Sequence, residues 1–181
     1  MALLTRLRDF FIRSVVPQGI VGLYTACVMQ ARQPDFYLAG VPDTVDGRFD
    51  LIILHIYLVM NKLQGRDEDK QQLFDLMFSD MDRSLREMGV GDMSIRKKMR
   101  PMISAFYGRA TAYDDALAGD DVVLAEVIQR NVFGSVAANA DSVQALVAYV
   151  RQAVIELTGQ NADDLVAGKV RFPTAATMKR G

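Results

Sequence analysis

The sequence of 181 residues contains no tryptophan, one cysteine and one histidine. The lone cysteine, Cys27, excludes an intramolecular disulfide and is typical of a reducing compartment. Cys27 and His55 cannot form a zinc site by themselves, and because both lie on predicted core faces they do not suggest a nucleophile and base pair. No glycine-rich phosphate loop and no Glu-x-x-His pair occurs. We therefore expect no catalytic residue, no metal, no cofactor and no enzymatic activity.

Neither sign of charge dominates, since 21 Lys and Arg stand against 22 Asp and Glu, for a net charge of -1 at pH 7. The chain as a whole has no electrostatic reason to bind DNA or an anionic membrane, so any such contact needs a local cluster. Arg6 and Arg8 are scattered among apolar residues, which differs from a signal peptide. The expected localisation is cytoplasmic, with peripheral contact at the inner membrane.

Long apolar runs are also missing. The uncharged stretch 14–31 contains Pro17, Gln18 and Gly19, and the apolar run 51–60 is too short to cross a bilayer. We predict no transmembrane helix.

Apolar residues recur three and four positions apart through most of the chain, whereas strand-like alternation is hard to find. The apolar content of 50% and the 5 prolines are typical of a well-packed globular protein, and the length fits one domain. The sequence therefore predicts the all-α class, in a single compact domain of six to seven helices. The expected helices cover about 1–14, 17–33, 44–64, 67–88 and 92–118, followed by one ending near 131 and one ending near 157.

The helix over about 44–64 has the widest apolar arc and is expected at the centre of the domain. Pro101 either bends the following long helix or marks its true start. The predicted organisation is an amphipathic N-terminal helix over 1–14, a helical domain over 15–168 and a loosely attached basic tail over 169–181.

Two mixed-charge clusters interrupt the apolar pattern, at residues 46–50 and 80–92. In the second cluster Asp82 with Arg86, and Arg83 with Glu87, are four positions apart, so pairing within the helix is one interpretation. A partner-binding surface is the other.

Basic residues gather in two further places. Arg6, Arg8 and Arg13 lie beside the apolar stripe of the N-terminal helix, which either contacts an anionic membrane or packs on the core. Residues 96–100 (RKKMR) form either a solvated helix face or a contact for ribosomal RNA or lipid phosphate. The predicted phosphate or membrane contacts are Arg6, Arg8, Arg13, Arg96, Lys97 and Arg100.

Five motifs in fixed order resemble the ubiquinol-cytochrome c chaperone family, of the alphaproteobacterial type. They are residues 30–37 (QARQPDFY), 40–50 (GVPDTVDGRFD), 78–83 (FSDMDR), 85–92 (LREMGVGD) and 105–109 (AFYGR), followed by Tyr113. The resemblance implies an all-helical chaperone, not an enzyme, that assists newly made cytochrome b in the assembly of ubiquinol-cytochrome c reductase. For mitochondrial relatives it also implies a small partner subunit and contact with the ribosome exit region.

Taken together, these patterns predict a client surface made of the charged clusters. The expected partner-binding residues are Asp46, Arg48, Asp50, Asp80, Asp82, Arg83, Arg86, Glu87 and Arg109. The alternative is a small helical enzyme or an apolar-ligand carrier, with an interhelical pocket near His55 and with His55 or Tyr107 as its polar anchor.

Overall fold

The most apolar helix of the sequence forms the centre of the molecule, as expected. Helix α4 (Val45–Lys62) begins at Thr44, whose hydroxyl accepts a hydrogen bond from the Gly47 amide at 3.1 Å. From Leu51 to Val59 every residue except Ile52 is buried, so the charged residues of this helix lie only near its two ends. Helices α2, α7 and α8 pack around it.

The computed structural model describes residues 16–134, 136 and 138–178, and within them every regular element is helical. The predicted all-α class and the compact single domain are confirmed. The N-terminal helix expected over 1–14 lies outside the described residues. The remaining elements are α2 (Gln18–Ala31), α3 (Pro34–Leu38), α5 (Asp67–Glu87), α6 (Asp92–Ala118), α7 (Asp121–Val132), α8 (Ala140–Thr158), α9 (Ala162–Val166) and the 3-10 turn η1 (Ala175–Met178).

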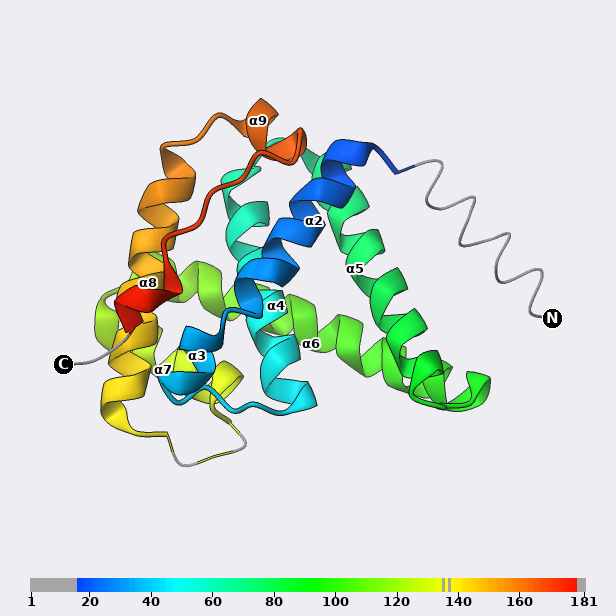
Figure 1. Cartoon of the computed structure of the whole chain (residues 1–181), viewed down its shortest axis with the longest axis horizontal. Coiled ribbons are helices and arrows are strands. Elements are labelled where there is room, and N and C mark those ends of the chain that lie inside the picture. Colours follow the sequence, from blue (N-terminus) through cyan, green and yellow to red (C-terminus); the bar gives the residue numbers. More distant parts are fainter. Residues whose placement is uncertain (1–15, 135, 137, 179–181) are drawn as a thin grey trace.

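The helices surround α4 on several sides. In Figure 1, α2 crosses α4, α5 lies on one side of this pair and α8 on the other. Helix α6 runs across the molecule from the end of α5 to α7, and it packs on both. The end of α5 and the start of α6 project from the body as a helical hairpin, which we call the α5–α6 arm (residues 80–100).

Two local differences from the sequence prediction have clear causes. Residues 34–38 lie between the helices expected over 17–33 and 44–64, yet they form the short helix α3, in which Pro34 occupies the first turn, where its missing N–H costs nothing. Helix α6 continues through Pro101 without a break. A proline removes only one backbone hydrogen bond, and packing on α5 and α7 holds the helix on both sides of it.

Close backbone contact joins α2 to α9. A Cβ atom added at Gly19 would lie 2.0 Å from the carbonyl oxygen of Val166, and one added at Gly22 would lie 3.4 Å from the Cα of Gly168. Gly168 itself has a φ of +82°, a conformation that favours glycine. At Gly19 and Gly168 a side chain would disturb this crossing, whereas Gly22 is only in van der Waals contact.

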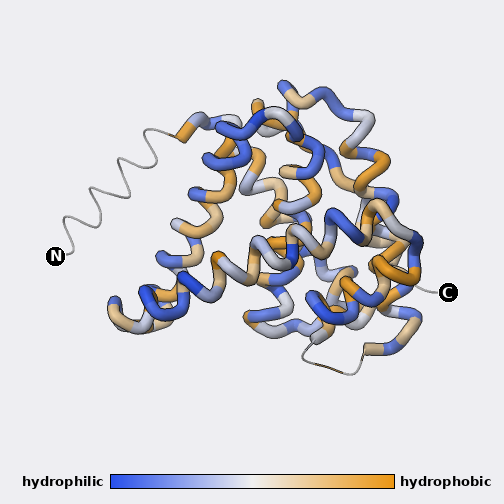
Figure 2. The backbone as a smooth tube through the Cα atoms, turned by 180° about the vertical axis from the view of Figure 1, so that it is seen from behind, coloured by the Kyte–Doolittle hydropathy of each residue, from blue (hydrophilic) through white to orange (hydrophobic). Residues whose placement is uncertain are grey.

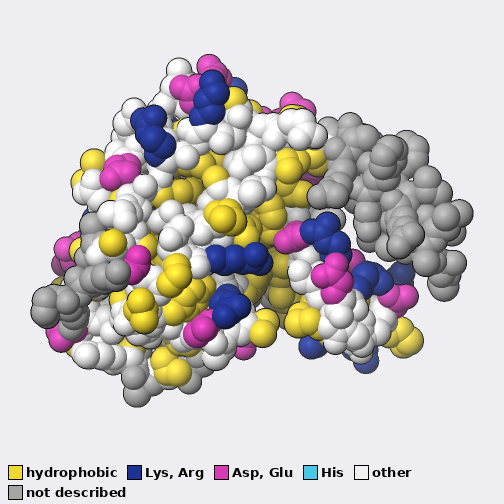
Figure 3. All heavy atoms as spheres, in the orientation of Figure 1, with side chains coloured by type: hydrophobic (Ala, Val, Ile, Leu, Met, Phe, Trp, Pro, Cys, Tyr) yellow, Lys and Arg dark blue, Asp and Glu magenta, His cyan; other side chains and the backbone are white. Residues whose placement is uncertain are grey.

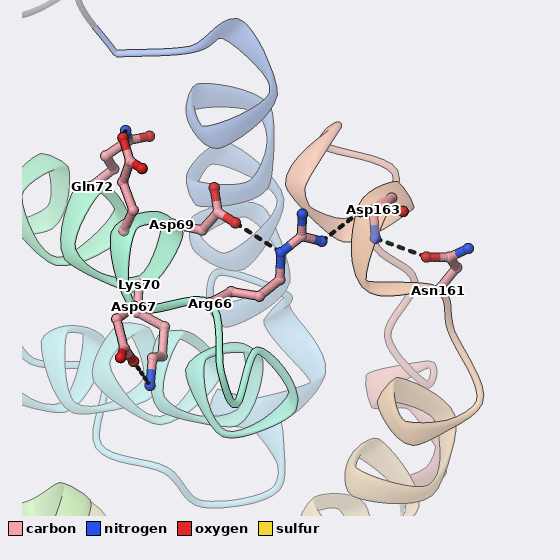
Figure 4. A network of polar contacts seen from close by, with 8 residues as sticks. Arg66, Asp67, Asp69, Lys70, Gln72, Asn161 and Asp163 are labelled. Carbon is pink, nitrogen blue, oxygen red and sulfur yellow. Dashed lines mark hydrogen bonds and ion pairs between the residues drawn. The ribbon is translucent and has the colours of Figure 1, made fainter.

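A polar clamp also fastens α9 to the α4–α5 connection. Arg66 contacts Asp69 at 2.9 Å and Asp163 at 2.7 Å, while Asn161 caps α9 by accepting the Asp163 amide at 2.8 Å (Figure 4). Asp163 is largely exposed, so the pair with Arg66 adds little stability by itself and chiefly fixes orientation.

The C-terminal segment packs against the core, which differs from the loose tail expected over 169–181. Ala175 and Met178 are 3% and 1% exposed. The side chain of Gln160 bonds both backbone groups of Arg171, accepting from its N–H at 2.8 Å and donating to its carbonyl at 2.7 Å. These contacts are long-range, so the basic and aperiodic sequence gave no sign of them. We call residues 170–178 the C-terminal strap.

Candidate functional site

A pocket of about 530 Å³ lies where the first turns of α4, the middle of α6 and the end of α7 meet. Its walls combine charged with apolar side chains. It is lined by Asp46, Phe49, Asp50, Pro101, Met102, Ala105, Arg109, Arg130, Asn131 and Gly134. Three of the nine residues expected from sequence to bind a partner, namely Asp46, Asp50 and Arg109, therefore share one site.

An ion pair spans this pocket from α4 to α6. Arg109 Nη2 lies 2.8 Å from Asp50 Oδ1, and the two side chains are only 26% and 14% exposed. Burial raises the pKa of Asp50 to about 6, because loss of water outweighs the attraction of Arg109, and the charge of Asp46 raises it further. The Asp50 carboxylate is thus costly to keep ionised.

The back of the pocket contains unused hydrogen-bonding capacity. Asn131 is 9% exposed and lines the pocket, and its Nδ2 has no hydrogen-bond partner of good geometry among the described residues. The buried hydroxyl of Tyr113, which does not line the pocket, lies near the Asn131 side chain. Burial raises the pKa of Tyr113, an effect that the nearby Asn131 amide opposes. Buried donors without partners are uncommon in native proteins, so Asn131 Nδ2 is the group of the pocket best placed to bond a water molecule or a ligand.

Arg48 does not join this pocket. It pairs with Asp43 at 2.6 Å and lies over the ring of Tyr37, 5.9 Å from the ring centroid. Both charges of the pair are more than half exposed, so Arg48 remains available on the α3–α4 side of the molecule.

The second charged cluster forms the polar side of the α5–α6 arm. Arg86 binds Asp82 at 2.7 Å, as predicted, and also binds Asp92 at the start of α6. The predicted pairing of Arg83 with Glu87 is wrong, because Arg83 instead pairs with Asp80, three residues earlier. Asp80 also accepts a hydrogen bond from the Tyr24 hydroxyl at 2.8 Å, which ties the arm to α2. Arg83 and Glu87 are exposed.

One face of the molecule is hollowed between α5 and the α2–α4 side. In Figure 3 hydrophobic side chains form the floor of this hollow, and basic and acidic side chains lie along its rim. Apolar surface rimmed by charge is typical of a protein-binding region.

His55 has a structural role at the core. Its Nδ1 donates to the Leu51 carbonyl at 2.8 Å, so Nε2 accepts from the Tyr149 hydroxyl at 2.8 Å. Gln30 in turn donates to Tyr149 at 3.0 Å. Burial lowers the pKa of His55 to about 4, although the hydrogen bond to Leu51 opposes this. With both nitrogens engaged and no part in the pocket above, His55 is a poor anchor for the expected carrier site.

The predicted phosphate contacts Arg96, Lys97 and Arg100 lie exposed on α6. Arg6, Arg8 and Arg13 fall outside the described residues. Within the described part of the chain no helix is long and apolar enough to cross a membrane, and no group of acidic, histidine or cysteine side chains is arranged to hold a metal ion.

Sequence reasoning missed the contribution of α7, namely Arg130 and Asn131. One signal was present: Asn131 is four residues after Val127 and three after Ile128, on the buried stripe of that helix, where a polar residue is unusual. Nothing in the sequence, however, indicates that this stripe meets Asp50 and Arg109.

Comparison with known proteins gives consistent matches. The sequence profile of the family described as Ubiquinol-cytochrome C chaperone matches residues 38–172. The chain is 31% identical over 156 residues to the mouse protein named Ubiquinol-cytochrome c reductase complex assembly factor 1, and 28% identical over 142 residues to Protein CBP3, mitochondrial, of Saccharomyces cerevisiae. These alignments cover 83% and 73% of the chain.

The crystal structure of the Cbp3 homolog from Brucella abortus is also similar. It superposes with a TM-score of 0.77 at 32% identity and covers 97% of this chain and 98% of that one. In contrast, the chain spans about half the length of the mouse and yeast relatives, 53% and 42% respectively.

Proposed function

The chain belongs to the ubiquinol-cytochrome c chaperone family, and on this premise we propose that it is an assembly factor for ubiquinol-cytochrome c reductase whose client is newly made cytochrome b. The observation that carries the proposal is the family match over residues 38–172, which includes all of the pocket and both charged clusters. Contacts with a small partner subunit and with the ribosome exit region remain predictions.

We propose that the client contact is not catalytic. The pocket offers two carboxylates, two guanidinium groups and an amide next to Phe49 and Met102, a mixture that suits a polypeptide segment with polar backbone and apolar side chains. The Asn131 Nδ2 group is a donor that awaits an acceptor such as a peptide carbonyl. The buried His55 and Cys27 lie in the core instead of this pocket, and the carboxyl group of the pocket whose pKa is raised, Asp50, is paired with Arg109.

The test measures cytochrome b accumulation in a strain from which the gene is deleted and in the same strain carrying a plasmid copy of the gene. Loss of cytochrome b and of reductase activity in the deletion strain, with unchanged transcript, supports the assembly role. Normal levels of both would refute it.

A charge swap then separates pairing from client contact. Asp50→Arg with Arg109→Asp keeps the ion pair but reverses its direction across the pocket. If the client contacts these charges, the swap lowers cytochrome b while the protein stays folded; full activity of the swap would mean that only the pairing matters. The matched control is the swap of the pair Asp67 and Lys70, which lie 2.8 Å apart and outside the pocket; this swap should have no effect.

A further inference from the structure

Positively charged side chains gather on the outer face of α6, although the net charge of the whole chain is only -1 at pH 7. Residues 93–113 contain five basic side chains and no Asp or Glu. Arg109 is paired with Asp50, whereas the other four are exposed and form no ion pair with a described residue. These four are Arg96, Lys97, Lys98 and Arg100.

Exposed apolar side chains share this face. Met93, Lys97, Arg100 and Tyr107 follow one another at intervals of four, three and seven residues, so they lie on one side of the helix. Met93 is 79% and Tyr107 is 55% exposed. The opposite side is buried against the body through Ile95 and Phe106, which are 1% and 2% exposed. The exposed side of α6 therefore carries both basic and apolar side chains.

Carboxylates of the α5–α6 arm offset this charge only in part. Residues 80–100 contain four acidic and six basic side chains, which leaves a net charge of +2 on the arm. Asp80 is bound by Arg83 and by the Tyr24 hydroxyl, and Asp82 and Asp92 share Arg86. Figure 2 shows the end of α5 and the start of α6 as a largely hydrophilic projection from the body. The positive charge consequently faces outward on a part of the molecule that can approach a flat surface.

We propose that this face, residues 93–107 of α6, binds the surface of an anionic lipid bilayer. Lys97 and Arg100, with Arg96 and Lys98 beside them, would meet lipid phosphates, and Met93 and Tyr107 would enter the boundary between headgroups and acyl chains, where such side chains are favoured. Charge complementarity selects the bilayer as a class of partner. The exposed methionine distinguishes it from RNA, since a thioether gains nothing from a phosphate backbone.

The lipid-binding face and the pocket share one helix but not one side of it. Met102 and Ala105 line the pocket from the side of α6 that is turned toward the body. The proposed face and the pocket are therefore separate surfaces. The surface itself does not depend on the proposed function, because lipid binding is measured without any client.

The first experiment is sedimentation of the full chain with vesicles of phosphatidylcholine alone or mixed with phosphatidylglycerol. Binding is expected only with phosphatidylglycerol and should fall with added salt. Lys97→Gln with Arg100→Gln should weaken it roughly fivefold for each charge removed. The control, Arg32→Gln with Arg171→Gln, removes the same charge from exposed positions outside α6 and should bind as the unmodified chain does. Equal binding of the α6 variant and the unmodified chain would overturn the proposal.

The second experiment asks whether Met93 enters the lipid. Met93→Cys labelled with an environment-sensitive fluorophore is specific, because Cys27 is 0% exposed. Its emission should shift to the blue with anionic vesicles, whereas the same label at Ile155→Cys, on a 66% exposed residue of α8, should not shift. Absence of the shift at position 93 would overturn the proposal, and so would binding of polyuridylate in place of vesicles.

Discussion

Asp50 and His55 lie one helical turn and a half apart on α4 and respond to pH in opposite directions. The folded state raises the pKa of Asp50 from 3.8 to about 6, so the fold retains a proton that the unfolded chain has lost. Its contribution to the free energy of unfolding is full below about pH 4 and is lost as the pH rises to about 6. His55 is the reverse: its pKa falls from 6.5 to about 4, so its contribution is present above about pH 6.5 and is lost as the pH falls to about 4.

Because each shift corresponds to up to about 3 kcal/mol, the two effects should largely cancel between pH 4 and 6.5. We predict that Asp50→Asn removes the stabilisation at low pH and leaves the destabilisation by His55 without compensation. The variant should become steadily less stable than the unmodified chain as the pH is lowered from about 6 to 4, with the difference measured by urea unfolding at several pH values. A difference that does not change with pH would contradict the assigned pKa of Asp50.

The hydrogen-bonded chain from Gln30 through Tyr149 and His55 to Leu51 gives a second prediction at the residue scale. Tyr149→Phe leaves His55 Nε2 without its buried donor, and should lower the free energy of unfolding by about 1–3 kcal/mol. Tyr107→Phe, at a half-exposed tyrosine, is the control and should change it by less than about 0.5 kcal/mol. Chemical denaturation of both variants provides the comparison.

At the scale of elements, the close packing of α2 against α9 depends on a glycine that has no side chain. Gly19→Ala would place a methyl group 2.0 Å from the Val166 carbonyl oxygen, so α2 and α9 must separate. We predict a loss of about 1–3 kcal/mol in unfolding free energy. Gly108→Ala, in the interior of α6 with nothing within 4 Å, should instead stabilise by about 0.5–1 kcal/mol, because alanine favours a helix. If both substitutions had the same sign in thermal unfolding, the close crossing would not be the cause.

The same comparison shows what the sequence could predict. Apolar periodicity located α4 and α5 to within two residues, because each buries a stripe whose spacing is visible in the chain itself. It could not reveal that Gly19 meets Val166 or that Asn131 meets the pocket containing Asp50, since these contacts join distant segments. For the charged clusters, the spacing correctly predicted the Asp82–Arg86 pair. It did not predict the partner of Arg83, because Asp80 at three residues and Glu87 at four residues are both within reach on a helix, and Arg83 pairs with Asp80.

At the scale of the whole molecule, the C-terminal strap connects helices that are far apart in the sequence. The C-terminal strap crosses α2 and α8: Gln30 donates to the Pro173 carbonyl at 2.9 Å, Phe172 packs edge-on against His55 with ring centroids 5.3 Å apart, and η1 packs on α3 and α8. It thus covers the polar chain that His55 and Tyr149 form in the core. Residues that were predicted to form a tail therefore cover part of the core.

We therefore predict that a chain ending at Lys169 loses far more stability than any exposed substitution. Removing the strap uncovers the Phe36, His55 and Tyr149 cluster and frees the Gln30 and Gln160 amides, so unfolding should shift by several kcal/mol and the variant should bind a hydrophobic dye before it unfolds. Lys169→Ala, at a largely exposed side chain, is the control and should behave like the unmodified chain. No strap residue lines the pocket, and the strap packs chiefly on α3 and α8, so the truncated chain at low temperature should still bind anionic vesicles. Simultaneous loss of folding and vesicle binding at all temperatures would mean that the strap holds the entire domain.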